Sequence, residues 1–194
     1  MPTHESAYIA LGANLGDRRR TMREALARLG RVEGVQVDAV SAAYDTPPIG
    51  PPDQPRYLNA AAALRTSLPP ERLLREMLAI ERDLGRDRSG SRWTARIIDL
   101  DLILYGTSVR SVECAAGEAN HPRAQAGEAP ADAASERLEL PHPRFRERAF
   151  VLVPLAEIAP RARDPVTGEE IESLLQTCPG RAEVIHAGSL ADDE

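Results

Sequence analysis

The order of the predicted secondary structure limits the fold of this chain more than any other feature of the sequence. Between residues 7 and 105 the pattern of apolar residues predicts strand, helix, strand, strand, helix and strand in turn. The expected strands cover residues 7–11, 35–44, 57–64 and 97–105. The expected helices lie within 17–30 and 68–85, where apolar residues recur every three or four positions and a glycine ends each pattern.

This order is that of the split βαβ, or ferredoxin-like, arrangement. It predicts an α+β fold in which an antiparallel sheet carries helices packed on it, followed by a C-terminal extension. We expect a single domain over residues 1–186, with a solvated, mobile insertion at 113–136 that is rich in Ala, Glu, Gly and Pro and lacks periodicity. Residues 187–194 are expected to form a frayed acidic tail.

Charge and composition argue against several classes of function. The net charge of −6 argues against general nucleic-acid binding. The sequence contains no run of 18 apolar residues, so no membrane span is predicted. No signal peptide is expected, so we predict a cytoplasmic protein, and Cys114 and Cys178 are expected to be free thiols in peripheral segments. All 24 Lys and Arg residues are arginines, which excludes a Walker A loop and leaves arginine, histidine or backbone N–H groups for any phosphate site.

Two carboxylates, Asp99 and Asp101, interrupt the last predicted strand. In a strand, residues i and i+2 point to the same face, so these two side chains should lie side by side. Ile98, Leu100 and Leu102 should then face the core. Two adjacent carboxylates raise one another's pKa unless a cation neutralises them, and ligation by oxygen alone suits Mg²⁺. The alternative is a solvent-exposed strand face, on which such a pair has no special role.

An arginine-rich loop precedes the two carboxylates. Its four arginines are offset by Asp87 alone, and they are Arg86, Arg88, Arg92 and Arg96. Such a loop, running into a strand with two carboxylates, suits a triphosphate with its metal ions, because arginines bind phosphate oxygens. The alternative is a solvated surface that pairs with the acidic insertion.

A stiff loop and a lone histidine complete the candidate site. Five prolines between residues 47 and 55 stiffen the loop, and Tyr57 and Asn59 follow it on one strand face. An aromatic ring beside an amide suits a flat, hydrogen-bonding heterocycle. His142, which lies between two prolines, can bind phosphate together with Arg148. The alternatives are a rigid connection with an ordinary tyrosine, and a histidine without a role.

Four blocks of the sequence resemble the 6-hydroxymethyl-7,8-dihydropterin pyrophosphokinase family of folate biosynthesis. The blocks span about Tyr8 to Pro160 and read YIALGANLGD, YDTPPIGPPDQPRYLNA, RW..R..DLDLILYG and LPHPRFRERAFVLVPLAEIAP. The resemblance implies a ferredoxin-like fold, two Mg²⁺ ions, and transfer of the β,γ-diphosphate of ATP to the pterin hydroxymethyl oxygen with release of AMP. We also expect a monomer that acts on small molecules, without a nucleic-acid or membrane partner.

The resemblance implies roles for individual residues. Asp99 and Asp101 would bridge both metal ions and form the catalytic group with three arginines, Arg86, Arg92 and Arg96. These arginines would also bind ATP, together with Glu81, Arg88, Trp93 on a closing loop, Leu102, Arg137, His142 and Arg148. The expected pterin pocket consists of Thr46, Pro48, Ile49, Tyr57, Asn59 and Phe150.

The sequence departs from the family pattern at four positions. Thr94 and Ala95 follow the loop tryptophan, where the family usually has Gly or Ala and then often Pro. Pro143 replaces a tyrosine, and Glu139 replaces a threonine that can contact the nucleotide. These departures motivate one alternative, a non-catalytic nucleotide- or pterin-binding homologue. A second alternative is an RNA-binding module of the same fold, although seven aromatic residues and a net charge of −6 argue against it.

Overall fold

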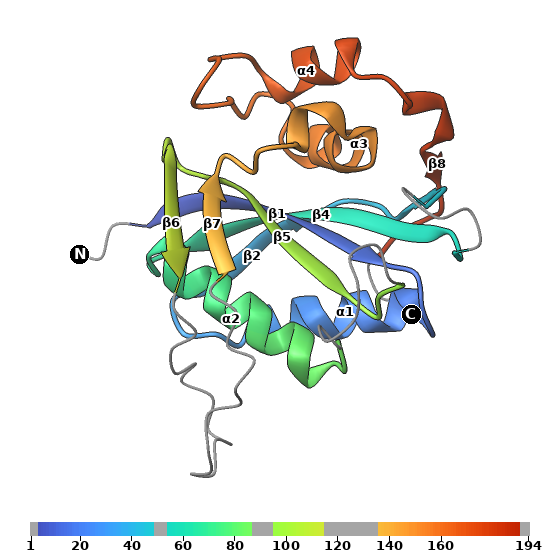
Figure 1. Cartoon of the computed structure of the whole chain (residues 1–194), viewed down its shortest axis with the longest axis horizontal. Coiled ribbons are helices and arrows are strands. Elements are labelled where there is room, and N and C mark those ends of the chain that lie inside the picture. Colours follow the sequence, from blue (N-terminus) through green and yellow to red (C-terminus); the bar gives the residue numbers. More distant parts are fainter. Residues whose placement is uncertain (1–3, 49–53, 87–94, 115–135, 191–194) are drawn as a thin grey trace.

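An antiparallel sheet of six strands forms the centre of the molecule (Figure 1). The computed structural model describes residues 4–48, 54–86, 95–114 and 136–190. The strands are β1 (Glu5–Ala13), β2 (Val35–Val40), β3 (Tyr44–Thr46), β4 (Tyr57–Thr66), β5 (Asp99–Tyr105) and β8 (Ile185–His186). They lie in the order β5-β1-β4-β3-β8, with β2 pairing with β4 beside β3. Every pairing in this sheet is antiparallel, as the sequence predicts.

Helices cover both faces of the sheet. The helices α1 (Arg18–Leu29) and α2 (Pro70–Asp83) pack on one face, and α3 (Ala149–Ile158) and α4 (Ile171–Thr177) lie on the other side (Figure 1). The two short 3-10 helices are Phe145–Glu147 and Arg181–Glu183. The predicted α+β, ferredoxin-like fold is confirmed, and its C-terminal extension forms the second helical layer. In the described part of the chain, no helix is long and apolar enough to cross a membrane.

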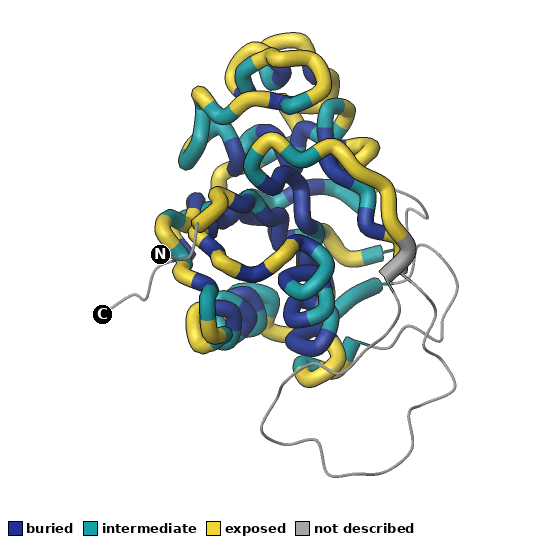
Figure 2. Tube along the Cα trace, turned by 90° about the vertical axis from the view of Figure 1, so that its left-hand side faces the viewer, coloured by how far each residue is buried: buried dark blue, intermediate teal, exposed yellow. Residues whose placement is uncertain are grey.

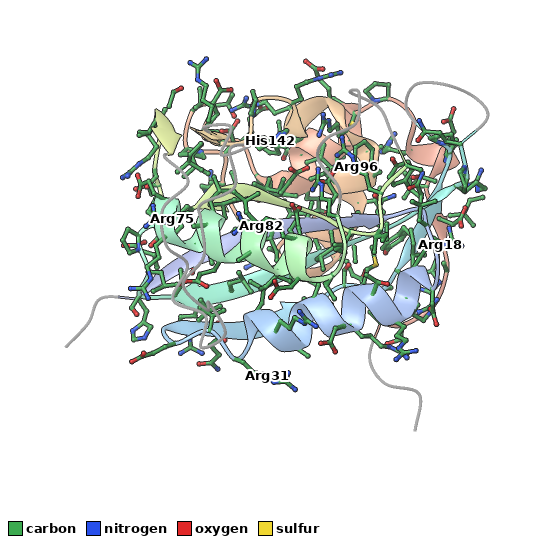
Figure 3. The ribbon with its side chains drawn as sticks, turned by 60° about the horizontal axis from the view of Figure 1, so that its bottom comes forward. Arg18, Arg31, Arg75, Arg82, Arg96 and His142 are labelled. Carbon is green, nitrogen blue, oxygen red and sulfur yellow. The ribbon has the colours of Figure 1, made fainter. Side chains whose placement is uncertain are left out.

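The first helical layer carries many of the arginines. Asp17 caps α1 as predicted, because its carboxylate accepts a backbone N–H three residues later at 3.1 Å. Of the arginines labelled in Figure 3, Arg18 begins α1, Arg31 lies two residues beyond its end, and Arg75 and Arg82 belong to α2. The arginines of this chain are therefore spread over the molecule as well as gathered near the predicted site.

The single strand predicted over 35–44 is two strands in the structure. The hydroxyl of Ser41 accepts the N–H of Ala61 at 2.9 Å, and the Ser41 N–H donates to the Ala61 carbonyl at 2.9 Å. A side chain thus replaces one backbone acceptor, which interrupts the regular strand. β3 then pairs with the start of β4, with Tyr44 opposite Asn59. β2 and β3 therefore both pair with the same edge of β4.

Two hydrophobic cores lie on opposite faces of the sheet, and the tube in Figure 2 shows the buried residues gathered inside. As predicted, Ile98, Leu100 and Leu102 belong to the core beneath α1 and α2. Beyond Leu102 the alternation changes, because the pairing of β5 with β1 passes over Ile103 in a bulge. Ile103 and Leu104 therefore both pack in the second core, beneath α3 and α4.

A second sheet of two strands is formed by β6 (Arg110–Cys114) and β7 (Glu136–Leu140). The insertion predicted over 113–136 therefore begins and ends inside paired strands, because the backbones of 113–114 and 136 pair across this sheet. The remainder of the predicted insertion, 115–135, lies outside the described residues. The prediction of a peripheral Cys178 is also wrong, because this cysteine is buried in the second core.

The prediction of a frayed tail is wrong for residues 187–190. Ala187 donates its N–H to the Ala43 carbonyl at 2.8 Å, and Ala43 donates to the Gly188 carbonyl at 2.8 Å. Arg23 of α1 donates to the Leu190 carbonyl at 3.1 Å, and Leu190 is only 3% exposed. An apolar anchor, Leu190, and an arginine from a distant helix, Arg23, thus hold a segment whose composition suggested a tail. Residues 191–194 lie outside the described part of the chain.

Candidate active site

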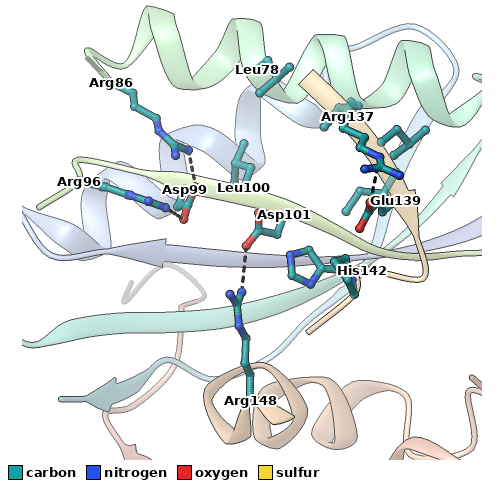
Figure 4. Close-up of a pocket in the computed structure, with 14 residues that line it drawn as sticks. Leu78, Arg86, Arg96, Asp99, Leu100, Asp101, Arg137, Glu139, His142 and Arg148 are labelled. Atoms are coloured by element: carbon teal, nitrogen blue, oxygen red, sulfur yellow. Dashed lines mark hydrogen bonds and ion pairs between the residues drawn. The ribbon is translucent and has the colours of Figure 1, made fainter. Parts of the chain in front are cut away.

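A pocket of about 450 Å³ lies where β5, β7 and α2 meet, beside the start of α3 (Figure 4). Its lining divides into a charged part and an apolar part. The charged part consists of Arg86, Arg96, Asp99, Asp101, His142 and Arg148. The apolar part is formed by Leu74, Leu78, Leu100, Leu102, Leu138 and Pro143, with Arg137 and Glu139 beside it. Eight of the predicted site residues line this pocket, which brings together residues from five separate segments of the chain.

Asp99 is the most strongly paired carboxylate of the pocket. One of its oxygens accepts from Nη1 of Arg86, and the other accepts from Nη1 of Arg96 (Figure 4). Arg96 is three residues before Asp99, whereas Arg86 reaches it from the end of α2. Two guanidinium groups are thus fixed beside the carboxylate, where each presents its remaining N–H groups to a ligand.

Glu81 does not line the pocket, in contrast to the predicted nucleotide contact. Its side chain is fully buried behind Arg86, and Oε1 accepts both from Arg86 Nη1 and from the backbone N–H of Leu100, the latter at 2.6 Å. Burial of this charge is tolerable because both donors satisfy it. Glu81 therefore supports Arg86 and β5 from behind.

Asp101 lies beside Asp99 on the same strand face, as the alternation predicts. Its side chain is 35% exposed, and one oxygen lies 4.0 Å from Nη1 of Arg148. Burial within the site, followed by the negative charge of Asp99, raises the pKa of Asp101 to about 6. The charges of Arg148, Arg86 and Arg96 lower the pKa of Asp101, but they do not cancel this rise.

His142 faces this carboxylate pair as a neutral imidazole (Figure 4). Its backbone N–H donates to Ile103 of β5 at 2.9 Å, which fixes the loop against the strand. Burial, followed by the charge of Arg148, lowers the pKa of His142 to about 4. The ring nitrogen Nδ1 accepts the backbone N–H of Arg144 at 3.3 Å, so the proton of the neutral ring is on Nε2. His142 can therefore donate one hydrogen bond to an anionic ligand.

Arg148, at the start of α3, contributes an unsatisfied donor. Its Nε is buried without a hydrogen-bond partner among the described residues, and its guanidinium lies 5.6 Å from the ring centre of Phe150. Buried donors without partners are uncommon in proteins and often mark functional sites. A ligand oxygen is the natural partner for the donors of this side chain.

The predicted heterocycle site adjoins the carboxylates through Gly12. Asn59 is buried and donates to the Thr46 hydroxyl at 2.7 Å, which orients its amide. In the sheet, Gly12 of β1 pairs with Asn59 on one side and with Asp99 on the other. A Cβ at Gly12 would lie 3.4 Å from Asn59 Oδ1 and 3.9 Å from both Tyr57 Cδ1 and Asp99 Cβ. Gly12 therefore lies between the predicted heterocycle site and the carboxylates, and a Cβ there would make van der Waals contact with both.

The remaining predicted residues have different positions. Phe150 is half-buried on α3 beside Arg148, and Pro48 is half-buried at the last described position before the gap in the proline loop. Leu102, a predicted nucleotide contact, lines the apolar part of the pocket. Four predicted site residues lie outside the described residues, namely Ile49, Arg88, Arg92 and Trp93. Thr94, one of the departures from the family pattern, lies outside them as well.

Glu139 is a third carboxylate in the pocket, and its charge is compensated. Its Oε1 lies 3.0 Å from Nε of Arg137, two residues earlier on β7, and both side chains line the pocket (Figure 4). Arg137 also donates to the Ser111 hydroxyl on β6 at 2.8 Å. The departure at this position therefore introduces an ion pair rather than an isolated negative charge.

Sequence reasoning missed Asn14, which connects two parts of the site. Asn14 is 3% exposed; its N–H donates to the Arg96 carbonyl at 3.0 Å, and its Oδ1 accepts the Arg96 N–H at 2.5 Å. Its Nδ2 donates to the Pro55 carbonyl at 3.3 Å and to Gln54 Oε1 at 3.4 Å. One buried amide thus fixes the backbone of Arg96 relative to the loop that leads to Tyr57. The available signal was a polar residue in the glycine-punctuated segment LGANLG.

Replacing Asn14 with alanine is expected to lower kcat/KM about 10²-fold, because small displacements of positioned groups are costly in catalysis. Steady-state kinetics with each substrate varied would measure the effect. Gln54→Ala, which removes one of the partners of Asn14, should have a smaller effect. Unchanged kinetic constants in a folded Asn14→Ala variant would show that this amide does not position the site.

Comparison with known proteins places this arrangement in a family. The family described as 7,8-dihydro-6-hydroxymethylpterin-pyrophosphokinase (HPPK) matches residues 8–160, which is more than half of the chain. The chain belongs to the HPPK family. The 2-amino-4-hydroxy-6-hydroxymethyldihydropteridine pyrophosphokinase of Methylorubrum extorquens is 43% identical over 164 residues, covering 84% of this chain and 87% of that protein. The Bacillus subtilis protein of the same name is 39% identical over 166 residues, covering 86% of this chain and 85% of its own length.

Solved structures with HPPK domains share the fold. An HPPK-DHPS crystallised with substrates aligns with a TM-score of 0.70 at 14% identity, over 91% of this chain. A Plasmodium falciparum HPPK-DHPS triple mutant gives a TM-score of 0.67 at 15% identity, over 90% of this chain. The chain spans less than half of these longer proteins, 43% in both cases. At such low identity the likeness supports the HPPK fold alone.

The acidic residues of this HPPK chain suit Mg²⁺ bound together with a substrate. Among the residues that the structure describes, no three His, Cys, Asp or Glu side chains form a group that could hold a metal ion. Mg²⁺ commonly takes one or two carboxylates and completes its coordination with water and substrate phosphates. Asp99 and Asp101 supply two carboxylates on one face of β5, and Nη1 of Arg148 lies 4.0 Å from an oxygen of Asp101. The donor set therefore fits Mg²⁺.

Proposed function

We propose that this chain transfers the β,γ-diphosphate of ATP to the hydroxymethyl oxygen of 6-hydroxymethyl-7,8-dihydropterin in folate biosynthesis, with release of AMP. One observation carries the assignment of the site. The paired carboxylates line a pocket with a cluster of arginines, and Gly12 alone separates Asp99 from the oriented amide of Asn59 across the sheet. This arrangement offers adjacent positions for a triphosphate and for a flat heterocycle, as diphosphate transfer between them requires.

Asp99 and Asp101 would hold two Mg²⁺ ions in this proposal. When bound, Mg²⁺ supplies positive charge that stabilises the transferred group and the departing AMP oxygen. The carboxylates of Asp99 and Asp101 need such cations, because burial together would otherwise favour protonation of Asp101. Arg86 and Arg96, which are already paired with Asp99, line the same pocket.

The basic side chains of the pocket would bind the triphosphate. Arg86 and Arg96 are fixed by Asp99, and Arg148 has a buried Nε without a partner among the described residues. His142 adds a neutral donor through Nε2, which avoids further repulsion among the cations. Reaction forms a bond between the hydroxymethyl oxygen and the β-phosphorus and breaks the bond from that phosphorus to the AMP oxygen. Catalysis of this step depends mainly on positioning and electrostatic stabilisation.

Asn59 would recognise the edge of the pterin ring, with Tyr57 and Phe150 near its faces. The amide is buried and oriented by Thr46, so it can present donor and acceptor in a defined direction. Arg88, Arg92, Trp93 and Ile49 remain proposed contributors from the family resemblance. The same proposal includes a cytoplasmic monomer whose ligands are small molecules.

The reaction can be tested by mixing the protein with ATP, Mg²⁺ and the hydroxymethyl dihydropterin and measuring AMP. AMP release should require all four components. AMP formation without the pterin would indicate an ATP hydrolase. Binding of both substrates without AMP formation would favour the non-catalytic alternative, although the pairing of Glu139 with Arg137 removes one of the reasons for it.

Asn59→Ala is expected to raise the KM for the pterin about tenfold or more, because a buried hydrogen-bonding edge of the ligand loses its partner. The KM for ATP should change little. Thr46→Val, which removes the hydroxyl that orients Asn59, should give a smaller change in the same direction. An equal rise in both KM values would contradict a separate pterin site at Asn59.

A further inference from the structure

Strand β3 carries the hydroxyl that orients Asn59, but it is only three residues long. Ser41 interrupts the strand before it, and the proline loop begins directly after Thr46. A strand of this length forms few backbone hydrogen bonds of its own, so its position depends on the segments beside it. β4 pairs with one edge of β3, and the other edge faces the C-terminal part of the chain.

Residues 185–190, which we call the C-terminal strap, occupy this other edge of β3. The strap begins with β8, which pairs antiparallel with β3 and places His186 opposite Tyr44. The rings of these two residues also pack edge to face, with their centres 5.6 Å apart. Beyond β8, two backbone hydrogen bonds of 2.8 Å connect Ala43 with the strap. The strap therefore continues the sheet past β3.

Helix α1 and the core beneath it hold the far end of the strap. Leu190 is 3% exposed and belongs to the same core as α1. Arg19 of α1 donates to the Ala187 carbonyl at 2.6 Å and also to the Ser189 carbonyl. The first turn of α1 contains arginines and no acidic residue, although positive side chains are unfavourable at the N-terminus of a helix. The contacts with the strap carbonyls give Arg19 a physical reason to lie there.

The strap is connected to one part of the site and separated from the other. Thr46 of β3 accepts a hydrogen bond from the Asn59 amide at 2.7 Å, so a displacement of β3 would remove the group that orients this amide. In contrast, the carboxylates of Asp99 and Asp101 are on β5, and two strands, β1 and β4, lie between β5 and β3. Loss of the strap should therefore affect the predicted heterocycle site more than the phosphate site.

We infer that the C-terminal strap positions the pterin site, with Leu190 and Arg19 as positioning residues that act through β3 and Thr46. This inference rests on the proposed function. Docking of the strap fixes β3, and β3 holds the Thr46 hydroxyl where it orients Asn59. Without the docked strap, β3 becomes a three-residue edge strand and the pterin site is correctly ordered for only part of the time. The apparent affinity for the pterin then falls in proportion to the ordered fraction.

The test compares the KM for the pterin with the KM for ATP in variants of the full chain. Leu190→Ala removes most of the apolar anchor. We expect it to raise the KM for the pterin about three- to tenfold, the effect of about one net hydrogen bond, and to change the KM for ATP less than about twofold. Arg19→Ala should give a smaller rise in the same direction. Leu190→Met, which nearly conserves the volume, should restore the wild-type values.

Leu68→Ala is the matched control for the loss of a buried leucine. Leu68 is 7% exposed in the same core as Leu190, and it follows the end of β4 that is opposite to Tyr57. This variant should lower the melting temperature and keep the wild-type ratio of the two KM values. Amide hydrogen exchange adds a readout that does not depend on activity, because residues 43–45 should exchange faster in Leu190→Ala than in Leu68→Ala.

These measurements separate the role of the strap from the proposed function. An unchanged KM for the pterin in Leu190→Ala, or an equal rise in both KM values, would overturn the role of the strap while the reaction itself stands. If thermal melting shows that Leu190→Ala is unfolded, Arg19→Ala decides by the same criterion. Failure of the wild type to form AMP from ATP and the pterin would instead reject the proposed function.

Discussion

Replacing Asp101 with alanine is expected to lower kcat/KM at least about 10³-fold, with the fold intact. Asp101 is 35% exposed in the pocket, and its closest cation among the described residues, Arg148, is 4.0 Å away, so little in the described structure depends on its charge. Its proposed role is to hold Mg²⁺, and that role has no substitute in alanine. Asp99→Ala should give a comparable loss, because it also releases Arg86 and Arg96. Steady-state kinetics and circular dichroism together measure both properties.

Asp38→Asn provides a matched control for the carboxylate variants. Asp38 pairs with Arg65 on the outer surface of the sheet edge, away from the pocket, and this change should leave turnover as in the wild type. If Asp101→Ala unfolds the protein, the residue serves the structure instead. If the variant turns over at a rate within tenfold of the wild type, the proposed metal site is wrong.

Replacing Asp164 with alanine is expected to lower the free energy of unfolding by about 3–5 kcal/mol, the range typical of breaking a buried ion pair. Asp164 is fully buried and accepts from Arg146 twice, at 2.5 and 2.8 Å. It also accepts the Val166 N–H at 3.0 Å and the Thr167 hydroxyl at 2.9 Å. This network ties the segment after α3 to the 3-10 helix that precedes it. Denaturant unfolding of both proteins measures the difference.

The pH dependence of this difference provides a further check. Burial raises the pKa of Asp164, but the hydrogen bonds from Arg146, Val166 and Thr167 outweigh it and leave the pKa below its ordinary value. The stabilisation is therefore complete above about pH 4, the ordinary value for aspartate, and is lost as the pH falls through the folded-state value. The wild-type advantage over Asp164→Ala should be constant near neutral pH and should shrink in acid. An advantage that grows in acid, or one below about 1 kcal/mol at pH 7, would contradict this account.

The sequence predicts the central part of the site because that part depends on local periodicity. Alternation along β5 places Asp99 and Asp101 on one face with Leu100 and Leu102 opposite, and this is what the structure has. Arg96 pairs with Asp99, and because it is only three residues earlier in the chain, its place in the site follows from the local sequence. The order of six elements likewise determines the sheet, because each element is recognisable from its own apolar pattern.

Features that depend on long-range contacts could not be predicted in this way. Asn14 acquires its role from partners 40, 41 and 82 residues away. Glu81 was expected at the nucleotide, but Arg86 lies between it and the pocket and Leu100 supplies its second donor. Leu190 sits in an acidic segment, and its burial depends on contacts with α1 and on the pairing near Ala43. The composition of a segment predicts only its local character, whereas the roles of Asn14, Glu81 and Leu190 depend on contacts with other segments of the fold.

The number of phosphates transferred tests the central claim most directly. The protein is mixed with ATP, Mg²⁺ and 6-hydroxymethyl-7,8-dihydropterin, and the products are separated and identified by mass spectrometry. The account predicts AMP and a pterin diphosphate in a one-to-one ratio. ADP with a pterin monophosphate, or AMP with free diphosphate and unchanged pterin, would contradict it.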